Sequence, residues 1–420
     1  MSTQILEAAT PALTFEEKLD RLAEVAVNVG LGLARGQELV MTATLDTLPL
    51  VRRITAHAYK AGAKYVTTLL MDEESTLLRY EYGPDESFDF APSWYYDGLA
   101  AAYKSGAARL AIAGGNPGLL SQQDPERVGR ANRAVSKAYR PALEFITRHD
   151  INWTIVAAAT PAWAATVFPD LSADQAVAKL WDAIFAASRA DLPDPVAAWK
   201  SHDAGLHRRA DLLNQKRYAE LHFRAPGTDL RVGLADDHRW LGGGTTAGNG
   251  RYCIPNMPTE EVFSTPHKDR TEGYVTSTKP LSHQGTMIEG IRVRFESGRV
   301  VEAKASKGEE VLNRMIETDD GARRLGEVAL VPHSSPIAHS GLLFNNTLFD
   351  ENAACHIALG QAYSTCIKNG DKLTPEQLAK LGANESLIHV DWMIGSGKMD
   401  VDGITASGAA EPLMRQGEWV

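Results

Sequence analysis

The sequence has few cysteines, no excess of positive charge and no long hydrophobic run. Its three cysteines, Cys253, Cys355 and Cys366, form no CxxC pair, which excludes a typical thiolate zinc site and indicates reduced thiols that fill space. The net charge of -10 disfavours a nucleic-acid-binding surface, because such a surface needs clustered basic residues. No apolar stretch approaches the roughly 20 residues that span a bilayer, and residues 1–12 lack the features of a signal peptide. We therefore expect a cytoplasmic protein without nucleic-acid or membrane partners.

The first half of the chain alternates between helix and strand patterns. Thr14 followed by Glu17 is a capping box, and it predicts an amphipathic helix that begins near Thr14. Strands are predicted at 38–45, 65–71, 108–113 and 152–159, with helices at 49–61, 93–104 and 124–148 between them. This alternation predicts a doubly wound α/β domain over residues 1–217, with a mostly parallel sheet and helices on both faces.

After about residue 217 the pattern changes to short alternating segments separated by glycine-containing turns. Residues 218–224 and 230–234 are predicted to form a hairpin, and further strands are predicted at 287–296, 299–305 and 328–331. We therefore expect a second domain of the α+β class over residues 218–420, with a mixed, largely antiparallel sheet and a few helices.

Side chains that bind metal ions are scattered through this second domain. A mononuclear catalytic site usually needs three protein ligands. The larger set found here suggests two ions that share a site, and it comprises Glu261, Glu327, His356, His389 and Asp391. Each member has a simpler explanation when taken alone: a salt bridge for the HxD pair, and a solvated strand end for each glutamate. The strand pattern of 388–396 places His389 and Asp391 on one face.

Residues 348–364 are interpreted as a helix. That helix would carry Asn352, His356, Gly360 and Tyr363 on one face, because steps of four and seven residues nearly complete whole turns. Gly360 would then allow close approach to the backbone, either by a metal centre or by another helix.

These segments resemble the aminopeptidase T and aminopeptidase S family of dinuclear metallopeptidases. The resemblance runs in order through 256–266 (NMPTEEVFSTP), 267–270 (HKDR), 326–337 (GEVALVPHSSPI), 346–356 (NTLFDENAACH), Tyr363 and 389–396 (HVDWMIGS). It covers the C-terminal half and, more loosely, the N-terminal half. One departure is His333, which stands where the family is expected to have tyrosine and could alter substrate preference.

The resemblance implies two divalent ions per chain and a homodimer that acts on short peptides. It implies metal ligands at Glu261, Glu327, His356, His389 and Asp391, with Tyr363 either as a sixth ligand or as a hydrogen-bond donor close to the metals. Zinc, cobalt, manganese and magnesium all accept carboxylate ligands, so the sequence leaves the identity of the metal open.

Two ions about 3.5 to 4 Å apart can polarise a scissile carbonyl and supply hydroxide at neutral pH. One of them can also receive the free α-amine of a peptide substrate. Glu260 is the candidate general base because it adjoins Glu261, although neighbouring strand residues point to opposite faces and this could leave Glu260 in solvent. His267, Lys268 and Arg270 are candidates for substrate binding, with a solvated basic turn as the alternative.

The predicted function is a metal-dependent aminopeptidase that removes N-terminal residues from short peptides. A mononuclear iron ring-cleaving dioxygenase is the alternative, because His356, His389 and Asp391 alone could form a 2-His-1-carboxylate triad. A non-catalytic binding protein is a third class. The presence of Glu261 and Glu327 argues against the dioxygenase, and the complete ligand set argues against the binding protein.

Overall fold

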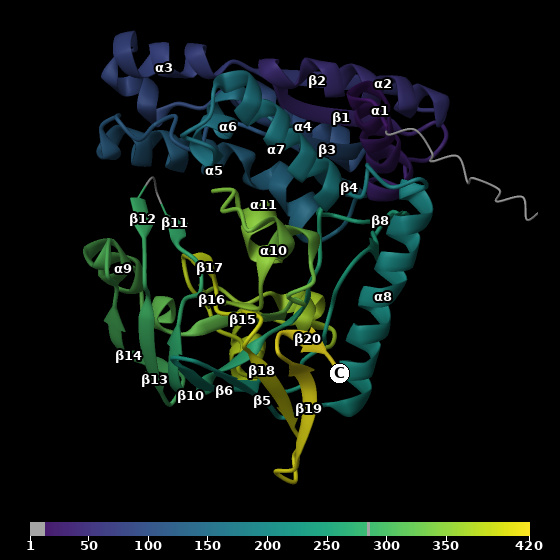
Figure 1. The fold of residues 1–420 in the computed structure, drawn as a ribbon. Helices are drawn as coiled ribbons and strands as arrows, with labels where there is room; N and C mark the ends of the chain where they lie inside the picture. Colours follow the sequence, from purple (N-terminus) through teal and green to yellow (C-terminus); the bar gives the residue numbers. More distant parts are fainter. Residues whose placement is uncertain (1–12, 284–285) are drawn as a thin grey trace, which may run out of the picture.

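A four-stranded parallel sheet organises the first half of the chain in the computed structural model, which describes residues 13–283 and 286–420 (Figure 1). The strand order is β2-β1-β3-β4, and every neighbouring pair is parallel. The strands are β1 (Glu38–Thr44), β2 (Tyr65–Met71), β3 (Ala108–Ala113) and β4 (Trp153–Ala157). All four lie where the sequence predicts them. The segment examined for a signal peptide, residues 1–12, lies outside the described residues.

Helices cover both faces of this sheet. Along β1, Leu39, Met41 and Ala43 pack into one apolar core, whereas Val40 packs into a separate core on the other face. The first core includes side chains of α1 (Phe15–Val25), α2 (Leu48–Lys60) and α7 (Ala173–Ala187), and the second includes α4 (Ser93–Lys104) and α5 (Pro125–Thr147). The doubly wound α/β prediction is therefore confirmed, as is the capping box at Thr14.

Three further helices complete the first half: α3 (Glu73–Tyr82), α6 (Pro161–Val167) and α8 (Pro195–Lys216). The sequence interpretation missed α3, α6 and α7. The long helix α8 runs down one side of the molecule beside the second half (Figure 1). None of the helices in the described part of the chain is both long and apolar enough to cross a membrane.

The second half contains two antiparallel sheets that pack around a shared apolar core. The larger sheet has the order β14-β13-β10-β6-β5-β18-β19-β20. Its strands are β5 (Glu220–Ala225), β6 (Thr228–Leu234), β10 (Pro266–Thr276), β13 (Arg292–Glu296), β14 (Arg299–Lys304), β18 (Asp400–Ile404), β19 (Ala410–Arg415) and β20 (Glu418–Trp419). The β5–β6 hairpin confirms the prediction for 218–234. The α+β class of this half is confirmed as well.

The smaller sheet has four strands in the order β17-β16-β15-β9. Its strands are β9 (Val262–Ser264), β15 (Leu325–Leu330), β16 (His356–Gly360) and β17 (His389–Met393). Two-stranded pairs are formed by β7 (Thr245–Thr246) with β8 (Tyr252–Cys253) and by β11 (Leu281–His283) with β12 (Thr286–Ile288). The short helices are α9 (Glu309–Ile316), α10 (Pro336–Ser340), α11 (Thr347–Asp350) and α12 (Pro375–Lys380).

The predicted helix over 348–364 is wrong. The helical part ends at α11 and a short 3-10 turn, Glu351–Ala353, and His356–Gly360 is a central strand that is buried throughout. A continuous apolar run such as Ile357, Ala358 and Leu359 suits a strand covered on both faces, and its spacing cannot be told from that of a buried helix. Gly360 has φ +109°, and an added Cβ would lie 2.0 Å from the carbonyl oxygen of Ile388. The close approach of the adjacent chain at Ile388, and not a metal or a second helix, therefore explains why glycine occupies this position.

The segment with α10 and α11 rises from the second half into the helices of the first (Figure 1). Phe344 and Phe349 stack with ring centroids 4.6 Å apart, and both belong to the first apolar core. The indole of Trp163 donates a hydrogen bond of 2.6 Å to the carbonyl oxygen of Phe344. The predicted division at residue 217 falls between α8 and β5 and stays a prediction, since this segment belongs to the core of the first half.

Candidate metal centre

The smaller sheet supplies the five candidate ligands, with two of them on β17 and one on or directly before each of its other three strands. Glu261 directly precedes β9, Glu327 lies on β15, His356 begins β16, and β17 carries His389 and Asp391. The register places Ala358 opposite both Glu327 and Asp391. Directly opposed residues in antiparallel strands share a face. The structure thus brings together all five side chains that the sequence singled out.

The five side chains form two groups that share one member. His356 Nε2 lies 3.1 Å from Glu261 Oε2 and 3.8 Å from Glu327 Oε1. His389 Nε2 lies 3.3 Å from Glu327 Oε2 and 3.5 Å from Asp391 Oδ1. In each group the ligand atoms lie within 4.8 Å of one another. Glu327 belongs to both groups and presents a different oxygen to each, which is the geometry of a bridging carboxylate.

Backbone carbonyls orient both imidazoles. His356 Nδ1 is 3.1 Å from the carbonyl oxygen of Ala354, and His389 Nδ1 is 2.7 Å from that of Gln361. Each ring therefore donates its Nδ1 proton to the backbone, and its Nε2 faces the carboxylates. Metal-binding histidines usually have their second nitrogen fixed in this way.

Negative charge is concentrated around these rings. Burial would lower the pKa of His389, but Asp391 and Glu327 raise it to about 11. Burial likewise opposes protonation of His356, yet Glu261 and Glu327 hold its pKa well above the ordinary value. Burial raises the pKa of the Glu261 carboxyl. Buried carboxylates must be paired or bound to metal, so a concentration of them around two histidines suits a cation site.

A fourth carboxylate, Glu351, joins the cluster and was missed by the sequence interpretation. Burial and the nearby carboxylates of Glu261 and Asp391 hold its pKa well above the ordinary value. Its position is fixed by the preceding residue: Asp350 accepts backbone N–H bonds of 2.8 Å from Phe344 and 2.9 Å from Asn346. The sequence interpretation placed Glu351 inside a helix over 348–364, with His356 on a face that did not include Glu351. In the structure the helix α11 ends just before Glu351, so the side chain can turn toward the cluster.

The donor set fits divalent ions. Glu261 Oε2 and Asp391 Oδ1 are both buried, and each faces a histidine: Glu261 Oε2 lies 3.1 Å from His356 Nε2 and Asp391 Oδ1 lies 3.5 Å from His389 Nε2. Bound divalent cations would replace the protons that the raised pKa values of these groups describe, because they would neutralise the buried carboxylates. Carboxylate oxygen and imidazole nitrogen are suitable ligands for zinc, cobalt and manganese. Glu261, Glu327 and His356 would hold one ion, and Glu327, His389 and Asp391 the other.

Ala358 lies opposite Glu327 and Asp391 on the face that carries the ligands, where a larger side chain would occupy the space beside the ligand side chains. Ala358→Leu is expected to fill that space and to remove at least one ion per chain, which metal analysis by mass spectrometry would detect. Overpacking a core costs about 1–3 kcal/mol, so a thermal melt should still show a folded protein. Ile357→Leu, on the opposite face of the same strand, is the control and should keep its metal. Full metal content in Ala358→Leu would place the ions elsewhere.

Glu260 is buried, with 3% of its surface exposed, so the solvent-exposed alternative is wrong. Its carboxylate turns away from Glu261 toward the helices of the first half. Arg189 Nη2 lies 2.8 Å from Glu260 Oε1, and His202 Nε2 lies 3.5 Å from Glu260 Oε2. Because the carboxylate is occupied by Arg189 and faces away from the two ligand groups, this geometry does not favour Glu260 as general base.

The three candidate substrate-binding residues lie on β10, which follows Glu261 and β9 along the chain. Arg270 pairs with Asp236 at 2.9 Å on the surface. The ring of His267 packs against Gly382 and accepts the backbone N–H of Asp269. The main-chain oxygen of Lys268 accepts a bond from Arg324. These contacts give His267 and Arg270 structural partners, and their role toward a substrate stays a prediction.

Tyr363 lies beside the cluster, in the loop after β16. Its ring centroid is 4.7 Å from that of His389, and its side chain is 45% exposed. Burial of the hydroxyl end and the nearby carboxylates of Glu327 and Asp391 raise the pKa of the phenol. A protonated phenol can donate a hydrogen bond at the open side of the cluster, which favours the donor role over the ligand role.

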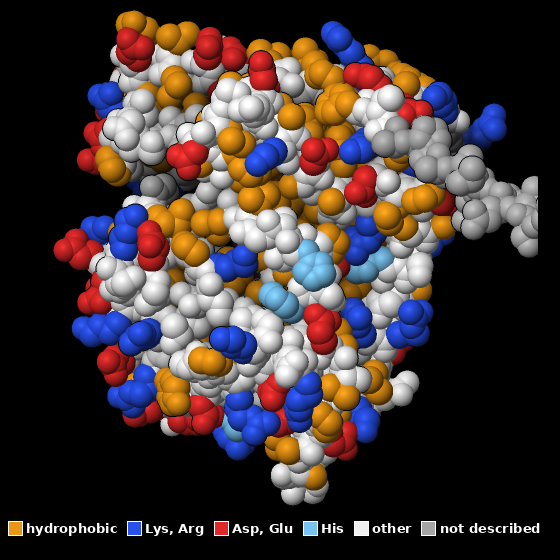
Figure 2. Space-filling model, in the orientation of Figure 1, with side chains coloured by type: hydrophobic (Ala, Val, Ile, Leu, Met, Phe, Trp, Pro, Cys, Tyr) orange, Lys and Arg blue, Asp and Glu red, His pale blue; other side chains and the backbone are white. Residues whose placement is uncertain are grey.

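A pocket opens next to the cluster. Asp391 and Glu351 line it together with Met393, Leu281 and Asn345, among others. Figure 2 shows the surface indented at this level, between the N-terminal helices and the region of β11 and β12. A substrate in this pocket would reach the carboxylates of the cluster directly.

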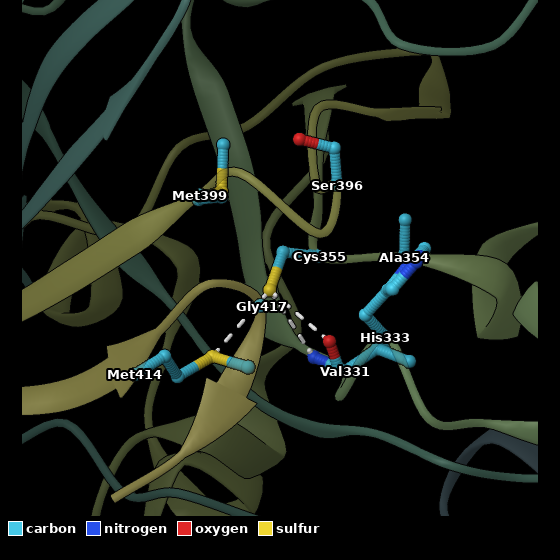
Figure 3. A pocket seen from close by; sticks show the side chains of 8 residues that line it. All are labelled: Val331, His333, Ala354, Cys355, Ser396, Met399, Met414 and Gly417. Carbon is cyan, nitrogen blue, oxygen red and sulfur yellow. Dashed lines mark hydrogen bonds between the residues drawn. The ribbon is translucent and has the colours of Figure 1, made fainter.

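A smaller pocket lies near the C-terminus and is formed by His333, Cys355, Met414 and neighbouring residues (Figure 3). Cys355 Sγ lies 3.3 Å from the carbonyl oxygen of Val331 and 3.7 Å from the sulfur of Met414. All three cysteines are free and buried. His333 lines this pocket, whereas Asp391 lines the other one; an effect of His333 on substrate preference therefore has no support from its position.

Known proteins are similar to this chain in sequence and in fold. Residues 15–419 match the family described as thermophilic metalloprotease (M29). Aminopeptidase T from Thermus thermophilus is 52% identical over 97% of this chain and 99% of its own length. The solved structure of wild-type AmpT from Thermus thermophilus superimposes with a TM-score of 0.92, at 51% identity, and covers 97% of this chain and 100% of that one.

A second solved structure bears on the dioxygenase alternative. The 2,5-dihydroxypyridine dioxygenase from Pseudomonas putida has a TM-score of 0.52 at 12% identity, over 97% of this chain and 98% of that one. This similarity shows a shared fold and nothing about the chemistry. In the present chain His356 and His389 fall into different candidate ligand groups, and Asp391 belongs only to the group of His389.

Proposed function

The chain belongs to the thermophilic metalloprotease (M29) family, and we propose that it acts as a metal-dependent aminopeptidase on peptides with a free N-terminus. Family membership confirms the resemblance drawn from the sequence motifs. We further propose that two divalent ions, of zinc, cobalt, manganese or magnesium, are bound by Glu261, Glu327, His356, His389 and Asp391.

The observation that carries this proposal is the position of Glu327. Its two carboxylate oxygens face two different histidines, whose Nε2 atoms lie at 3.8 and 3.3 Å. A mononuclear site needs no such bridging group. Two ions bound here would supply a Lewis acid and a hydroxide at neutral pH.

The remaining roles fall to side chains around the cluster. Glu351 belongs to neither ligand group and lines the open pocket with Asp391, so its carboxylate is placed to accept a proton from the attacking water. Tyr363 donates a hydrogen bond to the oxygen that becomes negatively charged as the peptide carbonyl is attacked. Met393 and Leu281 line the same pocket and would exclude water around the N-terminal side chain of the peptide.

Removal and return of metal tests the function. Treatment with a chelator is expected to abolish hydrolysis of aminoacyl substrates, and addition of single metals should restore it with about two ions per chain. One iron per chain with consumption of oxygen would overturn the proposal in favour of the dioxygenase. Retained hydrolysis by protein shown to be free of metal would also overturn it.

Recognition of the free amine is a separate prediction. The cluster is strongly acidic, so an N-terminal amine can bind to an ion or to a carboxylate, whereas an acetylated N-terminus cannot. N-acetylated peptides are expected to be cleaved at least about 100-fold more slowly than their free counterparts, which corresponds to about 2.7 kcal/mol. Chromatography of both peptides with the same enzyme would measure this. Equal rates would contradict anchoring of the amine.

We also propose that the protein is a cytoplasmic homodimer. Large apolar side chains are exposed around the edge strand β2 and the helices α3 and α4, among them Tyr65, Leu78, Tyr82 and Trp94. Such a patch is typical of an interface. Three buried, unpaired cysteines suit a reducing compartment. Sedimentation equilibrium would test the dimer.

A further inference from the structure

Glu261, one of the proposed metal ligands, lies on an irregular stretch of chain, and contacts from outside that stretch must hold it in place. Residues 254–261 lie between β8 and β9 and belong to neither strand. A strand fixes its side chains through its ladder of hydrogen bonds, whereas an irregular segment depends on side-chain contacts. The adjacent residue Glu260 provides such contacts.

Glu260 is held by side chains from the first half of the chain. Its carboxylate lies 2.8 Å from Arg189 Nη2, and both side chains are nearly inaccessible to solvent. His202, on α8, has its Nε2 2.8 Å from the main-chain oxygen of Thr259 and 3.5 Å from Glu260 Oε2. Arg209 of the same helix adds positive charge near Glu260. The segment is thus bound through two consecutive residues, Thr259 and Glu260.

The other side of Glu260 is fixed as well. Its backbone N–H donates a hydrogen bond of 2.6 Å to Asn352 Oδ1. Asn352 directly follows Glu351 in the short turn Glu351–Ala353. Glu260 and Glu261 face opposite sides of the segment: Glu260 pairs with Arg189, whereas Glu261 Oε2 lies 3.1 Å from His356 Nε2. Binding of Glu260 toward α7 and α8 therefore turns Glu261 toward His356.

Arg189 itself has an unusual backbone. It follows the C-terminal end of α7 with φ +58°, a conformation that glycine adopts most easily. Its guanidinium stacks on the ring of Trp199, with 4.8 Å between its central carbon and the ring centroid. Arg189 thus combines a backbone conformation that suits glycine with a side chain that is buried and paired with Glu260.

We infer that Arg189, His202 and Glu260 form a positioning unit that holds the metal ligand Glu261, so that the first half of the chain controls affinity for one of the two ions. The inference rests on the ligand set proposed above. Arg189 and His202 touch neither an ion nor a substrate, and they act through Glu260 and the backbone of 259–261.

Arg189→Gly tests this unit, because glycine relieves the backbone while it removes the guanidinium. Titration of metal-stripped protein with Co²⁺ is expected to show one of two ions bound about 10- to 100-fold more weakly, with a changed visible absorption spectrum for that ion. Arg189→Lys, which keeps the charge without the planar fork, should recover part of the affinity.

Arg217→Gly is the matched control: Arg217 also has a positive φ, +47°, at the end of a helix, but its pair with Asp237 is exposed. This control should bind both ions as the wild type does.

The double variant Arg189→Gly with Glu260→Gln separates positioning from the effect of an unpaired buried charge. It should recover thermal stability in the presence of chelator but keep the weakened affinity for Co²⁺. Recovery of both would overturn the inference, as would wild-type affinity in Arg189→Gly. Failure of the proposed ligand set gives a different result: Glu261→Gln would then bind as much Co²⁺ as the wild type.

Discussion

Glu327→Gln is expected to lose both ions and to reduce kcat/KM by at least about 10³-fold. The carboxylate faces both histidines, so its replacement by a neutral amide weakens both ligand groups at once. A loss of about 4 kcal/mol of transition-state stabilisation corresponds to this factor. Metal analysis after dialysis, together with steady-state kinetics on an aminoacyl substrate, would measure both effects.

Glu261→Gln is the matched control for the bridging role. Glu261 belongs to one ligand group only, so its amide variant should lose one ion and keep the one bound near His389 and Asp391. Equal metal contents in Glu327→Gln and Glu261→Gln would show that Glu327 does not bridge. Retention of both ions in Glu327→Gln would remove it from the ligand set.

Glu351→Gln is expected to keep both ions while kcat falls by about 10²- to 10⁴-fold, the usual contribution of a general base. KM should change little, because binding of the amine and the carbonyl does not require this carboxylate. The assay should use saturating metal, so that weakened metal binding does not mimic a loss of turnover. Loss of one ion from Glu351→Gln would instead identify Glu351 as a ligand.

Glu260→Gln in the same assay compares the two candidate bases. At saturating metal it should retain most of its turnover, because the Glu260 carboxylate is bound to Arg189. If Glu260→Gln loses turnover while Glu351→Gln does not, Glu260 is the base, as the sequence suggested.

Most of the fold can be predicted from the sequence, because local patterns determine where its helices and strands form. The strands at 65–71 and 108–113 and the helix at 93–104 form over the ranges that their periodicity predicts. The candidate ligands could be found for a related reason: metal-binding residue types are few, and the HxD spacing places His389 and Asp391 on one face of a strand.

Other parts of the site depend on contacts that no local pattern reveals. The spacing of His356, Gly360 and Tyr363 also fits a helix, and only the pairing of β16 with strands on both sides decides for a strand. Arg189 and Glu260 are far apart in the chain, and their contact follows from the packing of α7 and α8 against the second half. Long-range packing of this kind cannot be inferred from a single sequence.

The arrangement of ligands on four neighbouring strands limits how this protein can change in evolution. A one-residue insertion or deletion inside β15, β16 or β17 would turn every following side chain of that strand to the opposite face. Glu327 follows a local irregularity in the pairing of β15 with β16, so even this irregularity must be kept. Length changes should therefore accumulate in surface loops such as the β18–β19 turn, whereas the small sheet should keep its length wherever the metal centre is kept.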